Sequence, residues 1–194
     1  MTGISFRVEL DATEAQNRLH QLVKLMDQRR PFFAAVGDLL VGSAGRNFQA
    51  QSGPDGRAWT PLASATVKAR TRRGQTPITI LRSNSKGKIG SSLAGSINAR
   101  VTDDEVRVGS AVEYAAIHQL GGTINKPARQ GQIFRRRGKD GTVGRRFMKK
   151  KEANVVTEVA IPAYAITIPA RPFLGISVAD EADIFEAAER WLTL

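Results

Sequence analysis

Two histidines and a short run of acids are the residues in this sequence that could perform acid–base or metal chemistry. The histidines are His20 and His118, and the acids are the consecutive Asp103, Asp104 and Glu105. A metal centre needs several converging ligands, yet neither histidine has a second histidine near it in the sequence. Consecutive acids in an expected hairpin turn are typical of a solvated surface. We therefore expect no metal site here.

His118 is the stronger candidate for a chemical role, because Gln119 and Gly121-Gly122 follow it directly. A histidine in the last turn of a helix also interacts favourably with the partial negative charge that gathers there. We expect this structural role for His118 and a solvated position for His20. A hydrolase that pairs His118 with an acid stays open as a third possibility for the function.

Other catalytic groups are scarce. The 194 residues contain no Cys, which excludes disulfides, a thiol nucleophile and Cys-based metal clusters. Neither a P-loop nor a strand–GxGxxG–helix pattern occurs, and Ser91, Ser92 and Ser96 have no obvious base partner. We expect a protein that is not an enzyme and that needs no cofactor.

Positive charge is concentrated in residues 126–151. The chain has 29 Lys+Arg against 18 Asp+Glu, a net charge of +11, and this segment supplies eleven basic residues against Asp140. The rest of the chain is therefore nearly neutral. Such a segment favours a partner that is a polyanion such as DNA or an acidic protein surface. The alternative is a solvated loop that binds no partner. The basic residues are Lys126, Arg129, Arg135, Arg136, Arg137, Lys139, Arg145, Arg146, Lys149, Lys150 and Lys151.

The elements that position these residues begin with a strand over residues 4–10, whose apolar residues alternate. Asp11 and Glu14 then have capping-box spacing before a helix over residues 12–28. Pro31 suits the first turn of a second helix. The later expected elements are a short helix at 63–69, a short helix near 89–94, a hairpin of 96–101 with 105–109, a helix at 112–120, strands within 155–168 and a final helix from about Asp180.

Together these elements predict one α+β domain over residues 1–194. Its compact antiparallel sheet would pack against N-terminal and C-terminal helices. Four glycines within the basic segment 126–151 favour a long loop or extended hairpin, inserted into that domain. No apolar run approaches the ~20 residues that span a bilayer, so we expect a soluble protein with no membrane association.

Several short strings, in a fixed order between residues 48 and 175, resemble the phage virion morphogenesis family. They are Phe48, Gly53-Pro54-Asp55-Gly56, Trp59-Thr60-Pro61-Leu62, Gly95-Ser96-Ile97, Val108-Gly109, Tyr114-Ala115-Ala116-Ile117-His118-Gln119-Leu120-Gly121-Gly122 and Ile168-Pro169-Ala170-Arg171-Pro172-Phe173-Leu174-Gly175. Members of this family include tail-completion and neck proteins of tailed bacteriophages. The basic segment lies between the last two strings, where the family commonly carries a variable loop.

The resemblance implies a structural subunit. It would form a homo-oligomeric ring, expected to be a hexamer, that joins the tail to the DNA-filled head or caps the tail tube. Its partners would be the head–tail connector and the tail-tube or tail-terminator proteins, with non-specific contact to genomic DNA. Its location would be the neck or tail of the virion, and the host cytoplasm during assembly.

The matching strings also imply roles for single residues. His118 and Gln119 would hydrogen-bond a neighbouring loop, and a rigid bend would present Arg171 to a carboxylate while burying Phe173. Trp59 is expected either in the core or beneath an adjoining subunit. The residues expected to be structural or to lie in an interface are Trp59, Tyr114, His118, Gln119, Arg171 and Phe173.

The alternative of a different class is a nucleic-acid-binding accessory protein. It would act as a monomer or dimer and bind DNA through the basic segment without reading its sequence. Strong DNA affinity with a steep salt dependence and no ring would favour this alternative.

Overall fold

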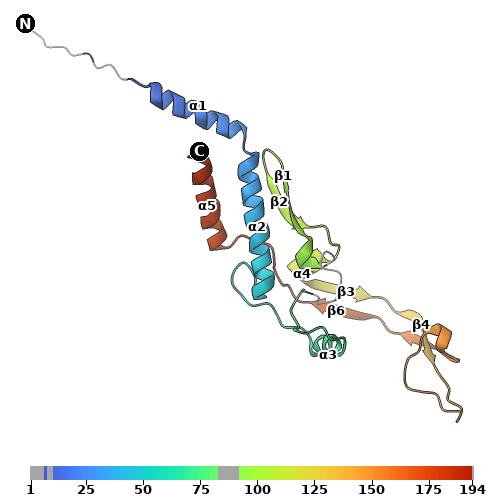
Figure 1. Cartoon of the computed structure of the whole chain (residues 1–194). Helices are drawn as coiled ribbons and strands as arrows, with labels where there is room; N and C mark the ends of the chain where they lie inside the picture. Colours follow the sequence, from blue (N-terminus) through green and yellow to red (C-terminus); the bar gives the residue numbers. More distant parts are fainter. Residues whose placement is uncertain (1–6, 8–10, 83–91, 194) are drawn as a thin grey trace, which may run out of the picture. The chain divides into compact units, whose positions relative to one another are not determined.

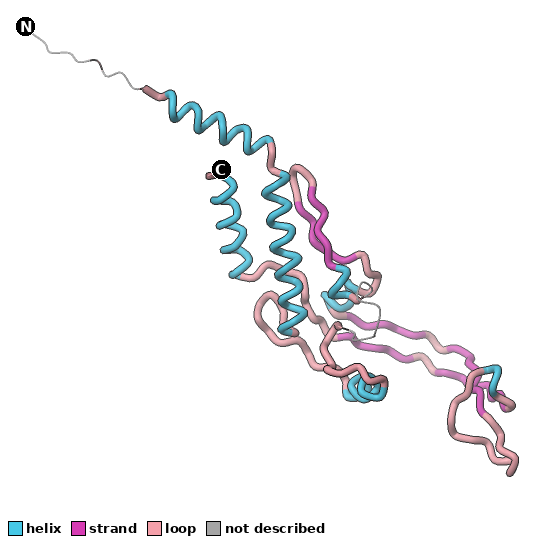
Figure 2. Tube along the Cα trace, viewed as in Figure 1, coloured by secondary structure: helices cyan, strands magenta, loops and turns pink. Residues whose placement is uncertain are grey.

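The computed structural model describes residue 7 and residues 11–82 and 92–193 of the chain. The chain divides into two units, which are described separately: residues 1–119 with 171–194 form the first, and residues 120–170 the second. Helices and antiparallel strands both contribute, which confirms the α+β class (Figures 1 and 2). The elements are α1 (Thr13–Asp27), α2 (Arg30–Ala50), α3 (Ser64–Arg72), the 3₁₀ turn η2 (Leu93–Ser96), β1 (Ile97–Val101), β2 (Val106–Ser110), α4 (Ala115–Leu120), β3 (Gly122–Lys126), β4 (Arg129–Arg135), the 3₁₀ turn η3 (Lys150–Glu152), β5 (Val155–Ile161), β6 (Tyr164–Ile168) and α5 (Val178–Leu192).

The first unit is organised around α2, which contacts both α5 and the β1–β2 hairpin (Figure 1). Pro31 lies in its first turn, where the missing N–H costs no helical hydrogen bond. A Cβ added to Gly37 would lie 3.0 Å from both Ala99 Cβ and Val106 Cγ2. Glycine at this position therefore lets the hairpin approach the helix closely.

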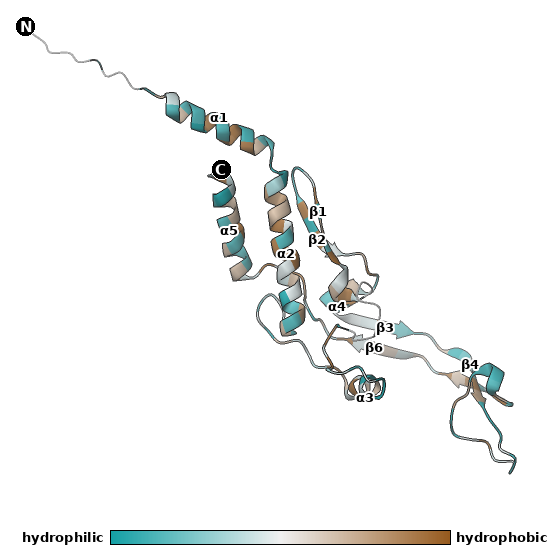
Figure 3. Ribbon diagram, in the orientation of Figure 1, coloured by the Kyte–Doolittle hydropathy of each residue, from teal (hydrophilic) through white to brown (hydrophobic). Residues whose placement is uncertain are grey.

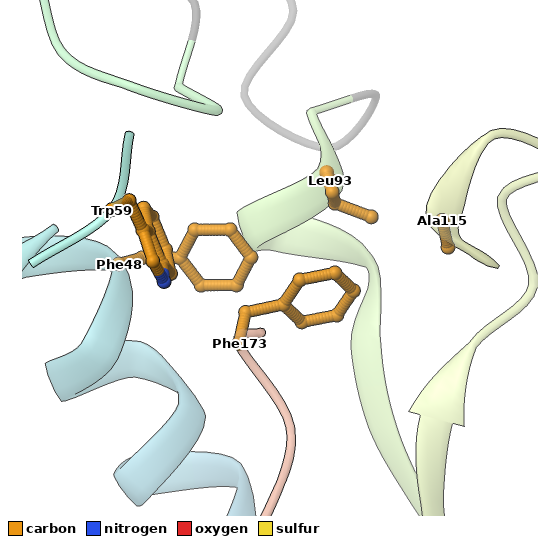
Figure 4. Packing of buried hydrophobic residues seen from close by; sticks show 5 residues of the cluster. All are labelled: Phe48, Trp59, Leu93, Ala115 and Phe173. Carbon is orange, nitrogen blue, oxygen red and sulfur yellow. The ribbon is translucent and has the colours of Figure 1, made fainter. Parts of the chain in front are cut away.

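The hydrophobic core of the first unit is an aromatic cluster at the C-terminal end of α2 (Figure 4). The Phe48 ring meets Trp59 edge-on at 5.6 Å between centroids and lies 5.1 Å from the Phe173 ring. Leu93 and Ala115 complete the buried cluster. Aromatic pairs in these geometries add about 1 kcal/mol each beyond the apolar area that they bury.

The second unit is a long antiparallel ribbon. β3 pairs with β6 from Gly122 opposite Ile168, and β4 pairs with β5 from Arg129 opposite Ile161. A Cβ on Gly131 would lie 3.0 Å from Ile161 Cδ1, so the isoleucine side chain covers this glycine across the strands. The strand expectation for residues 155–168 is confirmed.

Residues 136–154 form a folded loop at the end of the β4–β5 ribbon. Arg137 and Val143 make a β-bridge, and the Met148 N–H donates to the Phe134 carbonyl at 2.9 Å. The Asn154 amide also accepts the Arg137 N–H at 2.6 Å through its Oδ1. The expected basic loop or hairpin thus has two parts, a strand (β4) followed by this loop.

Four sequence expectations need correction or lie wholly or partly outside the described residues. The described strands make three two-stranded sheets instead of a single sheet. The capping box at the start of α1 is absent, because Ala12 takes the N-cap position while Asp11 accepts the Thr13 N–H and Glu14 pairs with Arg18. The expected strand over 4–10, except residue 7, and the first half of the expected helix near 89–94 lie outside the described residues.

Candidate functional site

The segment Arg171-Pro172-Phe173-Leu174-Gly175, here called the strap, connects to three other parts of the first unit. The Trp59 indole donates to the Pro172 carbonyl at 2.8 Å, and the Asn47 amide donates to the Phe173 carbonyl at 3.2 Å. The Arg171 N–H donates to the carbonyl of His118 at 2.7 Å. The strap is therefore held by α2, by the loop that contains Trp59, and by α4.

The side chain of Gln119 binds the strap as a neighbouring strand would. Its Oε1 accepts the N–H groups of Phe173 at 3.0 Å and Leu174 at 3.1 Å, and its Nε2 donates to the Leu174 carbonyl at 2.8 Å. The hydrogen bonds expected of Gln119 are present. Gln119 lies in the last turn of α4, two residues before Gly121, whose φ of 73° ends the helix.

Arg171 corrects a sequence expectation, since it does not face a carboxylate. Its side chain is buried at 6% exposure, with Nε donating to the Thr60 carbonyl at 2.9 Å and Nη2 to the Pro61 carbonyl at 3.2 Å. Among the described residues it makes no ion pair. Burial lowers the pKa of Arg171, but guanidinium stays charged at any ordinary pH. The planar guanidinium group can donate to two successive carbonyls as well as to one carboxylate.

Trp59 and Phe173 lie in the core of the chain itself. Both are almost fully buried against Phe48, so Trp59 is not an exposed anchor on this unit. Tyr114 is half-exposed, and its ring packs edge-on against the His118 ring at 5.9 Å. Trp59, His118 and Gln119 thus bind the strap, from the loop at 59 and from α4, whereas Tyr114 packs against His118.

A buried carboxylate at the start of α5, shortly after the strap, links α5 to α2. Asp180 has no solvent exposure, and its Oδ2 accepts from the Ser43 hydroxyl at 2.7 Å and from the Ser177 N–H at 2.9 Å. Burial raises the pKa of this carboxyl, but the Ser177 and Ser43 hydrogen bonds and the Arg46 charge together hold it below its ordinary value. Ser43 and Asp180 were missed as site residues, although Ser177 and Asp180 have capping-box spacing that indicates the helix start.

The eleven basic residues all belong to the second unit. Lys126 ends β3, Arg129 and Arg135 begin and end β4, and the other eight lie in the loop 136–154. All except Arg135 are exposed. In the part of the chain that the structure describes, none of the eleven makes a salt bridge, and Arg135 lies over the Phe147 ring at 5.6 Å. The positive charge of this unit is therefore not neutralised internally.

Comparison with known proteins decides the family. A model described as the phage virion morphogenesis family matches residues 10–193. The chain belongs to this family. The protein is thus a phage virion assembly protein, as the resemblance of the short strings implied.

Three relatives in phage Mu and Mu-like prophages agree with this membership of the phage virion morphogenesis family. Mu-like prophage FluMu G protein 1 of Haemophilus influenzae is 30% identical over 155 residues, which cover 77% of this chain and 96% of the relative. FluMu G protein 2 of the same organism is 25% identical over 184 residues, which cover 95% and 93%. The putative capsid assembly protein G of Escherichia phage Mu is 25% identical over 189 residues, which cover 97% and 94%. No solved structure matches the chain.

Within this family member, no cluster of three or more His, Cys, Asp or Glu in the described residues could hold a metal ion. No helix in the described ranges is long and apolar enough to cross a membrane. His118 lies beside the strap with its Nδ1 buried and without a hydrogen-bond partner among the described residues. Burial, and then the charge of Arg171, lowers the pKa of His118.

The lowered pKa of His118 predicts a pH-dependent stability. Below the ordinary value of about 6.5 the unfolded chain binds a proton that the folded chain does not bind, so the free energy of unfolding falls as the pH drops from that value to the lower folded pKa. Urea unfolding between pH 7.5 and 5 should show a smaller decline for His118→Gln than for the wild type. His20→Gln, which alters an exposed residue on α1, is the matched control. Equal declines in the two variants would contradict this assignment.

Proposed function

We propose that this protein is a structural subunit of the head–tail junction, a tail-completion or neck ring that joins the tail to the DNA-filled head. The family supports a role in virion assembly, and the phage Mu relative is named as a capsid assembly protein. In the first unit Trp59 and Gln119 donate hydrogen bonds to the strap, and the strap residue Arg171 donates to the Thr60 carbonyl. The proposal is therefore a binding role without catalysis or cofactor.

The observation that carries the proposal is the exposed, internally unpaired positive charge of the folded loop 136–154. Eight of the basic residues lie there against Asp140 and Glu152, and hydrogen bonds to the backbone shape the loop before any partner arrives. A subunit of a ring that surrounds the genome has a use for such a loop, because it can face either DNA phosphates or an acidic surface on a neighbouring connector. We place the protein in the neck or tail of the virion as a homo-oligomer, with the hexamer as the expected ring.

The second candidate is a nucleic-acid-binding accessory protein, and the same loop favours it. If the loop contacted about six phosphates, affinity would fall about a thousandfold between 50 and 200 mM salt. Within the basic segment 126–151 the aromatic residues are Phe134 and Phe147, which is little for stacking of single-stranded bases. Duplex DNA would therefore be bound through its backbone.

The test is electron microscopy of infected lysates that lack this protein. The proposal expects filled heads and finished tails that stay separate, joining when purified protein is added, and immunogold label at the junction of complete particles. A lysate without filled heads would contradict the junction role and would indicate an earlier role in capsid assembly. Filter binding across a salt series addresses the second candidate, which requires strong affinity from protein that forms no ring.

A further inference from the structure

The first helix, α1, carries an apolar stripe with little packed on it. Leu19, Leu22, Val23 and Met26 are 61%, 36%, 61% and 50% exposed, and no residue of the helix is buried. Figure 3 shows hydrophobic and hydrophilic residues alternating along it. An isolated helix of about 15 residues is marginally stable in water. The stripe is therefore expected to have a partner.

The spacing of these side chains is that of a helix that binds in a groove. Positions 19, 22, 23 and 26 are i, i+3, i+4 and i+7, which place four anchors on one face. Gln21 lies on the opposite, polar face. The stripe therefore fits an apolar groove.

Such a groove lies between the first turns of α2 and the last turns of α5 in the same unit. Its volume is about 480 Å³, and its lining includes Pro31, Phe32, Ala35, Ala187 and Trp191. The Phe32 and Trp191 rings stack at 5.4 Å between centroids and form part of this lining. This volume is within the range of roughly 300–1,000 Å³ that is typical of ligand-binding pockets.

In the structure α1 does not lie in the groove of its own chain, and a short connector joins it to α2. It consists of Gln28 and Arg29, and both are part of a helix end: the Gln28 N–H donates to the Leu25 carbonyl at 2.9 Å, and the Arg29 carbonyl accepts the Phe33 N–H at 3.1 Å. The Arg29 side chain also pairs with Asp104 in the β1–β2 turn. In this arrangement the stripe on α1 and the groove of the same chain are both left uncovered.

From this geometry we infer that α1 of one subunit docks in the α2–α5 groove of a second copy of the chain. The inference rests on the proposed homo-oligomer and supplies a contact for it. A 15-residue helix is about 22 Å long and 10–12 Å wide, so one such contact covers roughly 250 Å² on each partner. A subunit that gives its α1 to one neighbour and accepts α1 from another buries roughly 1,000 Å² over the two contacts, about the minimum for a specific interface. Head-to-tail exchange of this kind gives a ring where the rotation between subunits closes, and an open filament where it does not.

The cysteine-free sequence allows a direct test by disulfide cross-linking of the full chain. Leu22→Cys protein is mixed with Ala35→Cys protein that carries a tag of distinguishable mass, and the mixture is oxidised. The inference expects a mixed disulfide between the two chains, at least tenfold more abundant than with Gln21→Cys, the matched control from the opposite face of α1. The double variant Leu22→Cys/Ala35→Cys should give linear or closed chains of linked subunits.

Three results would overturn the inference. They are a double variant that cross-links within single chains, a Leu22→Cys variant that links mainly to itself, and a yield no greater than that of the Gln21→Cys control. Junction assembly is scored separately, by adding wild-type protein to lysates of separate heads and tails. If wild-type protein joins heads to tails but the cross-link does not form, the α1 docking is wrong and the junction role stands. If wild-type protein does not join heads to tails, the junction role is wrong.

Discussion

Replacing Arg171 by Ala is expected to reduce the free energy of unfolding by about 3 kcal/mol, roughly a hundredfold in the unfolding equilibrium. The guanidinium donates to the carbonyls of Thr60 and Pro61, and its stem is buried beside the strap. The variant would remove the donors of two carbonyls and the packing of the stem together. The midpoint of urea unfolding measures the loss.

The matched control for Arg171→Ala is Arg57→Ala. Arg57 is highly exposed and makes only a surface ion pair with Asp55, so its loss should change stability by about 0.5 kcal/mol or less. Arg171→Lys should fall between the two, because an ammonium cannot reproduce the fork that reaches both carbonyls. If Arg171→Ala were as stable as Arg57→Ala, Arg171 would not hold the strap to the loop at 59–61.

Replacing residues 136–154 by Asn-Gly is expected to separate the function of the basic loop from the fold. Arg135 and Val155 are directly paired, and a two-residue type I′ turn can join them. The change removes eight basic and two acidic residues and keeps β4 and β5. We expect a stability change of about 1 kcal/mol or less, loss of head–tail joining, and, if DNA is the partner, a fall of about a thousandfold in affinity at low salt.

The control for this loop replacement keeps the loop and its charge. In the variant Arg145→Lys/Arg146→Lys, joining should be close to that of the wild type, because the contacts are proposed to be electrostatic. The readouts are the fraction of joined particles in complemented lysates and filter binding of duplex DNA. If the Asn-Gly variant joined heads to tails at the wild-type level, the proposal that the loop is needed for joining would be wrong. Lost joining without any DNA affinity in the wild type would favour an acidic protein surface.

Much of the helical structure could be predicted from local patterns. Pro31 indicated the start of α2, and apolar periodicity indicated α1 and the final helix from about Asp180. The alternation over 96–109 predicted the β1–β2 hairpin, because the acidic turn and the strand period agree. The cap of α1 could not be predicted. Asp11 had more than one N–H within reach, and spacing alone does not decide which it accepts.

The second unit shows a different limit. Glycines and charge predicted a loop or hairpin over 126–151, but β4 forms within that range because β5 supplies its partners. Ile161 covers Gly131 across the ribbon, and this contact links residues thirty positions apart. A strand that depends on such pairing has weak local signals. Its boundaries could therefore not be read from composition.

The sequence by itself determined the family, the position of the positive charge and most of the helices, since short strings, net charge and periodicity are local properties. Only the tertiary structure decided what those strings do. Arg171 binds carbonyls that lie 110 and 111 residues earlier, and Gln119 binds the backbone 54 and 55 residues later. A buried polar group must find a partner, and which partner it finds depends on which distant segments the fold brings together.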